Sequence, residues 1–337
     1  MTKRALKTFP AGVRRVIQGV AALMVILVAL AMMPGAYAQD AFPNRPFTFV
    51  VPFSPGSGTD NSARVIAENF AKLAGQPVVV ENRPGANGFI AVQQVLKAPA
   101  DGHTIFVGSN STLAVNAALF KDLPYDPVAD FTPIAGVVRG PVVLIVPGNS
   151  PYKTLDELVQ AARANPDKMN FAGGSAGYQL MGELFNEIAQ IDTTHVPYKG
   201  APEAVLAVAS GQVDFAVVDV SASLELIRAG RVNALIAAAD KRLDNLPDVP
   251  TSAEAGLPDY TPYTWVAAMV SSKTPQPVAD KLSGLFEQVL NNSRSHEFFA
   301  NLNLLPMATD PKVLGEFQKE EVALWKRIAQ KAGVELR

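Results

Sequence analysis

The sequence predicts an α/β protein with two lobes, mostly parallel sheets and a ligand cleft between the lobes. Apolar strand patterns alternate with helical patterns from about residue 47 to residue 238, and such alternation is typical of parallel sheets. Two of these strands end in glycine-rich turns, at 54–60 and 173–177. Apolar segments at 134–146 and 265–270 look like paired strands that cross between lobes.

The first 38 residues have the three parts of a secretory signal peptide. Basic residues come first, a largely apolar stretch covers 16–33, and Ala-Tyr-Ala at 36–38 supplies the small residues of a cleavage site. A retained membrane anchor is the alternative, but the apolar stretch is short and interrupted. We therefore expect cleavage after Ala38 and a periplasmic location.

Composition restricts the function of the remaining 299 of the 337 residues. The leader would remove five basic and no acidic residues, so the net charge would move from −2 to −7. A strongly acidic balance argues against a nucleic-acid or anionic-membrane partner. The sequence contains no cysteine, which excludes disulfides, thiolate metal sites and a Cys-linked lipid. We expect a monomer.

The elements follow one another in a regular order. Strands are predicted at 47–51, 78–81, 104–107, 134–138, 142–146, 169–172, 194–196, 213–218, 232–238 and 265–270. Helices are predicted at 60–74, 88–98, 111–120, 154–164, 178–190, 201–210 and 221–229, followed by 277–291, 295–301 and 310–332. On this pattern lobe one comprises 40–140 plus 265–337, and lobe two comprises 141–264.

The first glycine-rich turn has the features of an anion site. It follows the strand at 47–51 and leads directly into a helix. The first N–H groups of a helix have no intrahelical acceptor and carry the positive end of its dipole, so an anion can bind there without Lys or Arg. Gly56 and Gly58 would let the backbone approach a ligand, and Ser54 lies at the start of the turn.

Three further residues of this turn have a structural alternative. The hydroxyl of Ser57 could bind a carboxylate or cap the helix. Thr59 or Asp60 is predicted to be the N-cap, and the carboxylate of Asp60 would satisfy helix N–H groups rather than face an anion.

The turn at 173–177 repeats this arrangement in the predicted second lobe. Gly174, Ser175, Ala176 and Gly177 precede another helical pattern, with Ser175 placed either to donate to a ligand or to cap the helix. Two such turns on opposing lobes would face one cleft. A ligand could then bridge the lobes and close them.

The same turn also matches the G-x-S-x-G nucleophile elbow of serine hydrolases. A hydrolase that uses Ser175 is therefore an alternative from another functional class. The downstream histidines are His195, which follows too soon, and His296, which lies in the helical tail. We expect no catalytic residue.

No cofactor or metal is expected. The three histidines are widely separated and show no ligand pair at i, i+3 or i+4. The turn with Gly56 and Gly58 lacks the third glycine of a dinucleotide fingerprint.

Two charged segments are predicted to be structural. Arg83 is predicted to hold the first turn through its planar side chain, and 316–331 is predicted to be a solvated helical face.

Motifs along the mature sequence resemble those of the periplasmic receptors of tripartite tricarboxylate transporters, the Bug family. They appear in family order at 42–46, 51–56, 81–88, 100–104, 123–127, 130–133, 195–200, 211–214, 246–251 and 254–258, for example Glu-Asn-Arg-Pro-Gly-Ala-Asn-Gly at 81–88. Two departures are the Pro-Gly-Ser at 55–57, where Pro-Gly-Gly is usual, and a second turn about two residues shorter than the common pattern.

The resemblance implies a type II-like periplasmic binding fold. It also implies a receptor that captures a small di- or tricarboxylate, or a related organic acid, and delivers it to membrane transporter subunits without catalysis. A sensor subunit that presents its ligand to a membrane kinase would share the same cleft and stays open as an alternative. Ligand would be held chiefly by backbone N–H groups of the two turns. The resemblance adds Ser109, Asn110 and Asp219 to the expected ligand-binding residues.

Overall fold

The computed structural model describes residues 12, 19, 20, 22–24, 42–307 and 310–337. The chain falls into two units, Met1–Phe42 and Pro43–Arg337. In the first unit the described residues 12, 19, 20 and 22–24 are helical and exposed. Most of the predicted signal peptide and its cleavage site after Ala38 lie outside the described residues. Within the described part of the chain, no helix combines the length and apolarity needed to cross a membrane.

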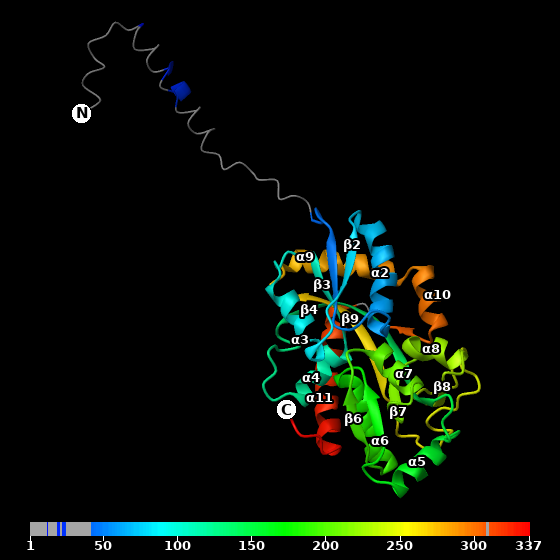
Figure 1. The fold of residues 1–337 in the computed structure, drawn as a ribbon. Helices are drawn as coiled ribbons and strands as arrows, with labels where there is room; N and C mark the ends of the chain where they lie inside the picture. Colours follow the sequence, from blue (N-terminus) through cyan, green and yellow to red (C-terminus); the bar gives the residue numbers. More distant parts are fainter. Residues whose placement is uncertain (1–11, 13–18, 21, 25–41, 308–309) are drawn as a thin grey trace. The chain divides into compact units, whose positions relative to one another are not determined.

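The described strands of the second unit are joined through one long strand, β4 (Phe131–Pro147), which belongs to two sheets (Figure 1). The first sheet has the order β2-β1-β3-β9-β4, and β10 also pairs with β4. Its other strands are β1 (Phe47–Val51), β2 (Val78–Asn82), β3 (Thr104–Ser109), β9 (Tyr263–Ser271) and β10 (Leu305–Pro306).

The second sheet continues from the end of β4 in the order β4-β7-β5-β6, and β8 also pairs with β4. Its other strands are β5 (Asn170–Gly173), β6 (Thr194–Pro197), β7 (Phe215–Asp219) and β8 (Val232–Ala237). Within each sheet the strands that alternate with helices run parallel: β1 with β2 and β3, and β5 with β6 and β7.

The sheets are mixed rather than mostly parallel, because every pair that involves β4 or β9 is antiparallel. The two strands predicted on either side of residues 139–141 are one 17-residue strand. Gly140 and Pro141 remain paired with β9, and from Val142 onward β4 pairs with β7 and β8. A proline is tolerated here because it stands where β4 changes partners. Strand pairing runs through β4, so the division into lobes at 141 and 265 stays a prediction.

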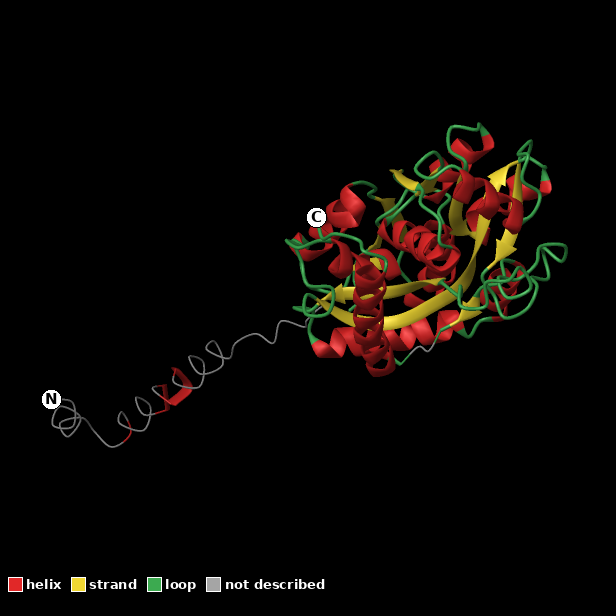
Figure 2. Cartoon of the chain, turned by 90° about the horizontal axis from the view of Figure 1, so that it is seen from below, coloured by secondary structure: helices red, strands yellow, loops and turns green. Residues whose placement is uncertain are grey.

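Helices pack on both sides of the strands (Figure 2). The helices and helical turns are α2 (Gly58–Ala74), η2 (Ala86–Gly88), α3 (Phe89–Lys97), η3 (Ser111–Val115), α4 (Asn116–Leu119), α5 (Leu155–Ala164), α6 (Ala176–Ala189), α7 (Ala201–Ala209), α8 (Val220–Arg228), α9 (Gln276–Leu290), α10 (Ser293–Asn301) and α11 (Pro311–Lys331). Each predicted helix is present, with ends that differ from the prediction by at most two residues, and η3 with α4 replaces the single helix predicted at 111–120.

Aromatic packing fixes the position of α2 over β1. Phe47 and Phe49 alternate along β1 and both are fully buried against Phe70 of α2, with ring centroids 5.0 and 5.4 Å apart. Phe286 of α9 stacks on Phe49 from the same side. Burial of these rings stabilises the β1–α2 unit, so the turn between them is held by a rigid core.

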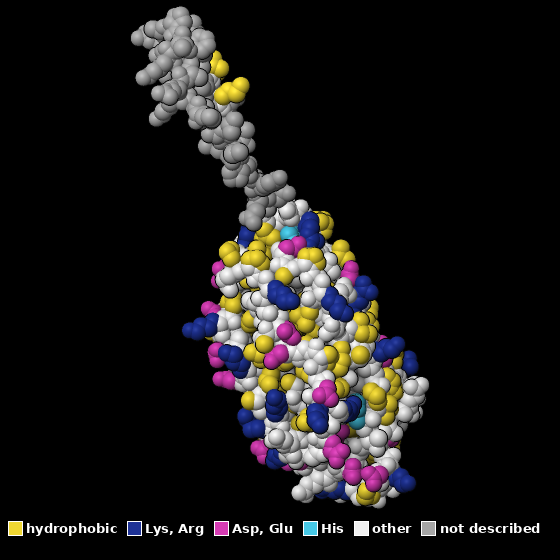
Figure 3. Space-filling view, turned by 90° about the vertical axis from the view of Figure 1, so that its left-hand side faces the viewer, with side chains coloured by type: hydrophobic (Ala, Val, Ile, Leu, Met, Phe, Trp, Pro, Cys, Tyr) yellow, Lys and Arg dark blue, Asp and Glu magenta, His cyan; other side chains and the backbone are white. Residues whose placement is uncertain are grey.

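Charged residues of both signs are interspersed over the face shown in Figure 3, without a continuous basic patch. The prediction of a solvated face at 316–331 is wrong for one side of α11, where Gln318, Glu321 and Trp325 are buried. The polar side chains there bond to other buried groups, which a charge pattern does not reveal.

Candidate ligand-binding site

Four strand-to-helix turns of the second unit meet around one cavity of about 30 Å³. Two turns follow β1 and β3 of the first sheet and lead into α2 and η3, and two follow β5 and β7 of the second sheet and lead into α6 and α8. The carboxyl ends of parallel strands are where open α/β sheets bind ligands. The arrangement directs four helix N-termini toward one space.

The N-cap of α2 is Ser57, and the prediction of Thr59 or Asp60 is wrong. Ser57 has an extended backbone, and its hydroxyl accepts a hydrogen bond from the Asp60 N–H at 3.3 Å. The helix begins earlier than its apolar pattern because Gly58 and Thr59 are polar or small. Their N–H groups, in the first turn of α2, find no acceptor among the described residues. Both residues line the cavity.

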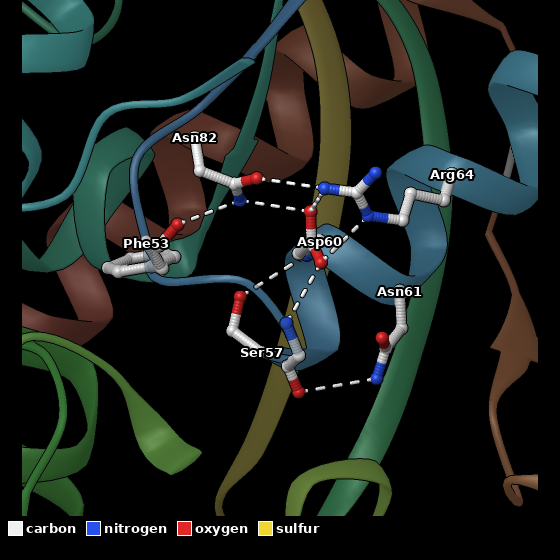
Figure 4. A network of polar contacts seen from close by, with 7 residues as sticks. Phe53, Ser57, Asp60, Asn61, Arg64 and Asn82 are labelled. Atoms are coloured by element: carbon white, nitrogen blue, oxygen red, sulfur yellow. Dashed lines mark hydrogen bonds and ion pairs between the residues drawn. The ribbon is translucent and has the colours of Figure 1, made fainter. Parts of the chain in front are cut away.

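Asn82, at the end of β2, stabilises this turn through hydrogen bonds of its side chain (Figure 4). Its side-chain amide donates to the carbonyl of Phe53 at 3.0 Å and to the carboxylate of Asp60 at 2.9 Å, and it accepts from Arg64 at 2.9 Å. The other carboxylate oxygen of Asp60 accepts from the Gly56 N–H at 2.9 Å. The network leaves the carboxylate of Asp60 turned toward its own loop.

The residue predicted to support the turn, Arg83, does not do so. Its guanidinium pairs with the neighbouring Glu81 at 3.0 Å and is half exposed. We expect Asn82→Ala to lower the free energy of unfolding by about 2 kcal/mol, because two acceptors, the Phe53 carbonyl and the Asp60 carboxylate, and one donor, Arg64, lose a partner. Arg83→Ala is the matched control and should change it by less than about 0.5 kcal/mol. Urea unfolding measures both, and equal effects would contradict this assignment.

Ser175 is the N-cap of α6 and links the two sheets. Its hydroxyl oxygen accepts from the Tyr178 N–H at 3.5 Å and from the Ser111 hydroxyl at 2.8 Å. The oxygen of Ser111 accepts in turn from the Gly177 N–H at 3.1 Å. The Ala176 N–H, in the first turn of α6, has no acceptor in the described chain. The second turn therefore also presents a free donor from a helix N-terminus.

Asp219 caps α8 and contributes a carboxylate to the cavity wall. It accepts from the Tyr178 hydroxyl at 2.5 Å, from the Ala222 N–H at 2.9 Å and from the Ser221 hydroxyl. Burial, together with the nearby Asp219 carboxylate, raises the pKa of Tyr178. The phenol therefore stays protonated and continues to donate at neutral pH.

Asn110 supplies a side-chain donor to the cavity wall. It stands at the start of η3, is 2% exposed and lines the cavity. Its amide nitrogen has no hydrogen-bond partner among the described residues. Leaving a buried amide nitrogen unpaired is costly, so a ligand oxygen that accepts from it would recover that cost.

Nine of the thirteen predicted site residues line the cavity: Ser57, Gly58, Thr59, Ser109, Asn110, Gly174, Ser175, Gly177 and Asp219. Four do not. Ser54 donates to Glu203 of α7 at 2.6 Å, Gly56 makes the positive-φ turn, Asp60 binds its own loop, and Ala176 is buried at the start of α6. Ligand contacts by the thirteen residues stay a prediction.

Other cavity residues were not predicted to bind a ligand. Phe53, Ser111, Ser221 and Thr264 line it. Ser111 and Ser221 follow the ends of β3 and β7 by two residues, and this position is the signal that could have indicated them. Trp265 also lines it, and its indole N–H donates at 2.7 Å to Glu321. The period of α11 alone does not reveal this pairing.

The geometry does not favour a serine hydrolase. The Ser175 hydroxyl is bound to Ser111 and to a backbone N–H. The ring of His195 packs on Phe171, with centroids 5.1 Å apart, and lies against Gly173. Burial lowers the pKa of His195 to about 4. Among the described residues there is also no cluster of three or more potential metal ligands.

Comparisons with known proteins identify the family. Residues 62–334 match the model of the tripartite tricarboxylate transporter family receptor. The chain belongs to this family. It is 33% identical to protein BugT of Bordetella pertussis, over 94% of this chain and 98% of BugT.

The solved structure of periplasmic binding protein BugD, which is 32% identical with a TM-score of 0.83 over 88% of this chain and 100% of BugD, confirms the periplasmic binding protein fold. MatC from Rhodopseudomonas palustris with bound malate is 35% identical, with a TM-score of 0.81 over 85% of this chain and 99% of MatC. R. palustris Rpa4515 with adipate is 31% identical, with a TM-score of 0.84 over 88% of this chain and 100% of Rpa4515. The chain is thus a solute-binding receptor of the tripartite tricarboxylate transporter family.

Proposed function

We propose that this receptor binds a small carboxylate between the turns after β1 and β5 and delivers it to the membrane subunits of a tripartite tricarboxylate transporter. The proposal rests on a set of hydrogen-bond donors without a partner that line or border one cavity. They are the N–H groups of Gly58, Thr59 and Ala176 and the side-chain amide of Asn110. Oriented backbone donors stabilise an anion without a cationic side chain. The malate and adipate bound in two structures similar to this chain support a carboxylate as the ligand class.

The lobes, in this proposal, are 40–140 with 265–337, and 141–264. The cavity of about 30 Å³ holds one or two water molecules, which is less than a four-carbon acid needs. Ligand entry therefore requires the two pairs of turns to separate and close again. The closed form with ligand is the one that the transporter would recognise.

The mature protein, cleaved after Ala38, would act in the periplasm as a monomer, without catalysis and without a nucleic-acid partner. The capped Ser175 supports the absence of hydrolase chemistry, and a fluorophosphonate probe should leave it unlabelled. The acidic balance of the mature chain supports the absence of a nucleic-acid partner.

A cognate carboxylate should stabilise the protein against heat. At a hundredfold excess over its dissociation constant, the expected gain is roughly 2.7 kcal/mol. The experiment is a thermal shift and calorimetry screen on protein stripped of co-purified ligand, with C3 to C6 acids that include malate and adipate, and with their uncharged amides as controls. Absence of both a shift and heat for every acid would overturn the proposal. Native mass spectrometry of unstripped protein would identify the ligand.

A further inference from the structure

The wall of the cavity contains one anionic side chain and no cationic one. Among the described residues that line it, Asp219 is the only charged residue, and it is 4% exposed. A side chain added at Gly58, in the first turn of α2, would lie 2.9 Å from its Oδ1. The Asp219 carboxylate therefore lies beside Gly58 in the first turn of α2.

Asp219 has capacity for one more donor. An ionised carboxylate has about four acceptor sites, and three of them are taken by Tyr178, Ser221 and Ala222. A ligand carboxylate in direct contact with Asp219 would be repelled, so the part of the ligand that lies against Asp219 is its uncharged carbon chain, where an O–H or N–H group would complete the hydrogen bonds of Asp219. The amide nitrogen of Asn110, on the same cavity, needs an acceptor.

A hydroxyl group satisfies both requirements, because it accepts one hydrogen bond and donates another. We propose that Asp219 makes the receptor select a carboxylate that carries a hydroxyl, or another O–H or N–H donor, on its carbon chain. This inference rests on the proposed function and specifies the ligand class. It assigns Asp219 a role in specificity as well as in capping α8.

The test compares acids that differ by one hydroxyl. Malate with succinate, lactate with propionate, and 3-hydroxyadipate with adipate are titrated by calorimetry into wild type and Asp219→Asn. Asparagine keeps the shape and the capping ability of aspartate, but its single carbonyl oxygen has two acceptor sites for three protein donors. In wild type the hydroxy acid of a bound pair should bind at least about tenfold more tightly. In Asp219→Asn the ratio should fall below about threefold.

A matched control separates specificity from capping. Asp310 caps α11 by accepting from the N–H groups of Lys312 and Val313, and it does not line the cavity. Asp310→Asn should leave the hydroxyl preference unchanged. If Asp219→Asn does not fold by circular dichroism, Asp219→Ser, which also provides an N-cap, replaces it.

Each outcome distinguishes the two proposals. A hydroxyl preference that is lost in the Asp219 variant and kept in the Asp310 variant supports the inference. Equal binding of both members of each pair in wild type, or a preference that survives in Asp219→Asn, overturns the inference and leaves the receptor function standing. Failure of every acid to bind wild type overturns the proposed function itself.

Discussion

Gly58→Ala should weaken carboxylate binding by at least about 100-fold, roughly 2.7 kcal/mol, while the protein stays folded. Gly58 is the first residue of α2 and lines the cavity. A methyl group there would lie 2.9 Å from Asp219 Oδ1 and 3.1 Å from Ser221 Oγ, and it would occupy much of a cavity of about 30 Å³. The ligand would lose its approach to the N–H groups of the first turn.

Position 58 tests the site more cleanly than Gly174 or Gly56, because the atoms that an added methyl would meet there belong to the side chains of Asp219 and Ser221 and not to the backbone. A methyl group at Gly174 would lie 2.3 Å from the backbone of Gly200, and Gly56 has a φ of +83°, so substitution at either strains the fold itself. The backbone of Gly58 is helical and accepts alanine.

The matched control for Gly58→Ala is Gly284→Ala in α9, where the added methyl meets no atom within 4 Å. It should bind like wild type and gain up to about 1 kcal/mol of stability. Calorimetry with the cognate acid measures affinity, and circular dichroism checks the fold. A Gly58→Ala protein that binds within threefold of wild type would contradict a ligand held at the start of α2.

Glu321→Ala should lower the free energy of unfolding by about 4 kcal/mol. Glu321 is 3% exposed, and its carboxylate accepts from Tyr263 at 2.8 Å, Trp265 at 2.7 Å and Trp325 at 3.1 Å. Truncation leaves two buried indole donors and the part-buried Tyr263 hydroxyl without an acceptor, and it opens a cavity beside them. Trp265 also lines the ligand cavity. The contact between Trp265 and Glu321 therefore links the packing of α11 to the site.

Two further variants test whether loss of the buried carboxylate acceptor causes the loss of stability in Glu321→Ala. Glu321→Gln keeps one carbonyl oxygen and should lose about half as much stability. Glu316→Ala removes an exposed partner of Lys319 on the same helix and should change stability by less than about 0.5 kcal/mol. Chemical unfolding of the three proteins provides the values. A loss below 1 kcal/mol for Glu321→Ala would show that Tyr263, Trp265 and Trp325 find other acceptors.

The local elements were predictable because each depends on a short pattern. Phe47 and Phe49 alternate, the helix that follows β1 has an apolar face, and glycine-rich turns mark the ends of β1 and β5. The continuity of β4 was not predictable, because Gly140 and Pro141 look like a break until their pairing with β9 is known. Antiparallel pairing of β4 and β9 likewise depends on partners that are remote in the sequence.

The site was predictable where backbone geometry defines it and not where side chains meet across the fold. Glycines and small polar residues after parallel strands predicted Gly58 and Ser175, and the family resemblance added Asn110. The support of the first turn by Asn82, rather than by the adjacent Arg83, depends on which side of β2 faces the turn. The Glu321 contacts with Trp265 and Tyr263 join residues 56 and 58 positions apart, so no local pattern could show them.

The most direct test of the central claim is an amide NMR titration of the mature protein with the acid that gives the largest thermal shift. Free helix N–H groups that bind a carboxylate should show the largest changes in chemical shift. We predict these changes at Gly58, Thr59 and Ala176, which start α2 and α6. Saturable binding with unchanged amides at all three residues, and with the largest shifts elsewhere, would contradict a carboxylate held between the two turns.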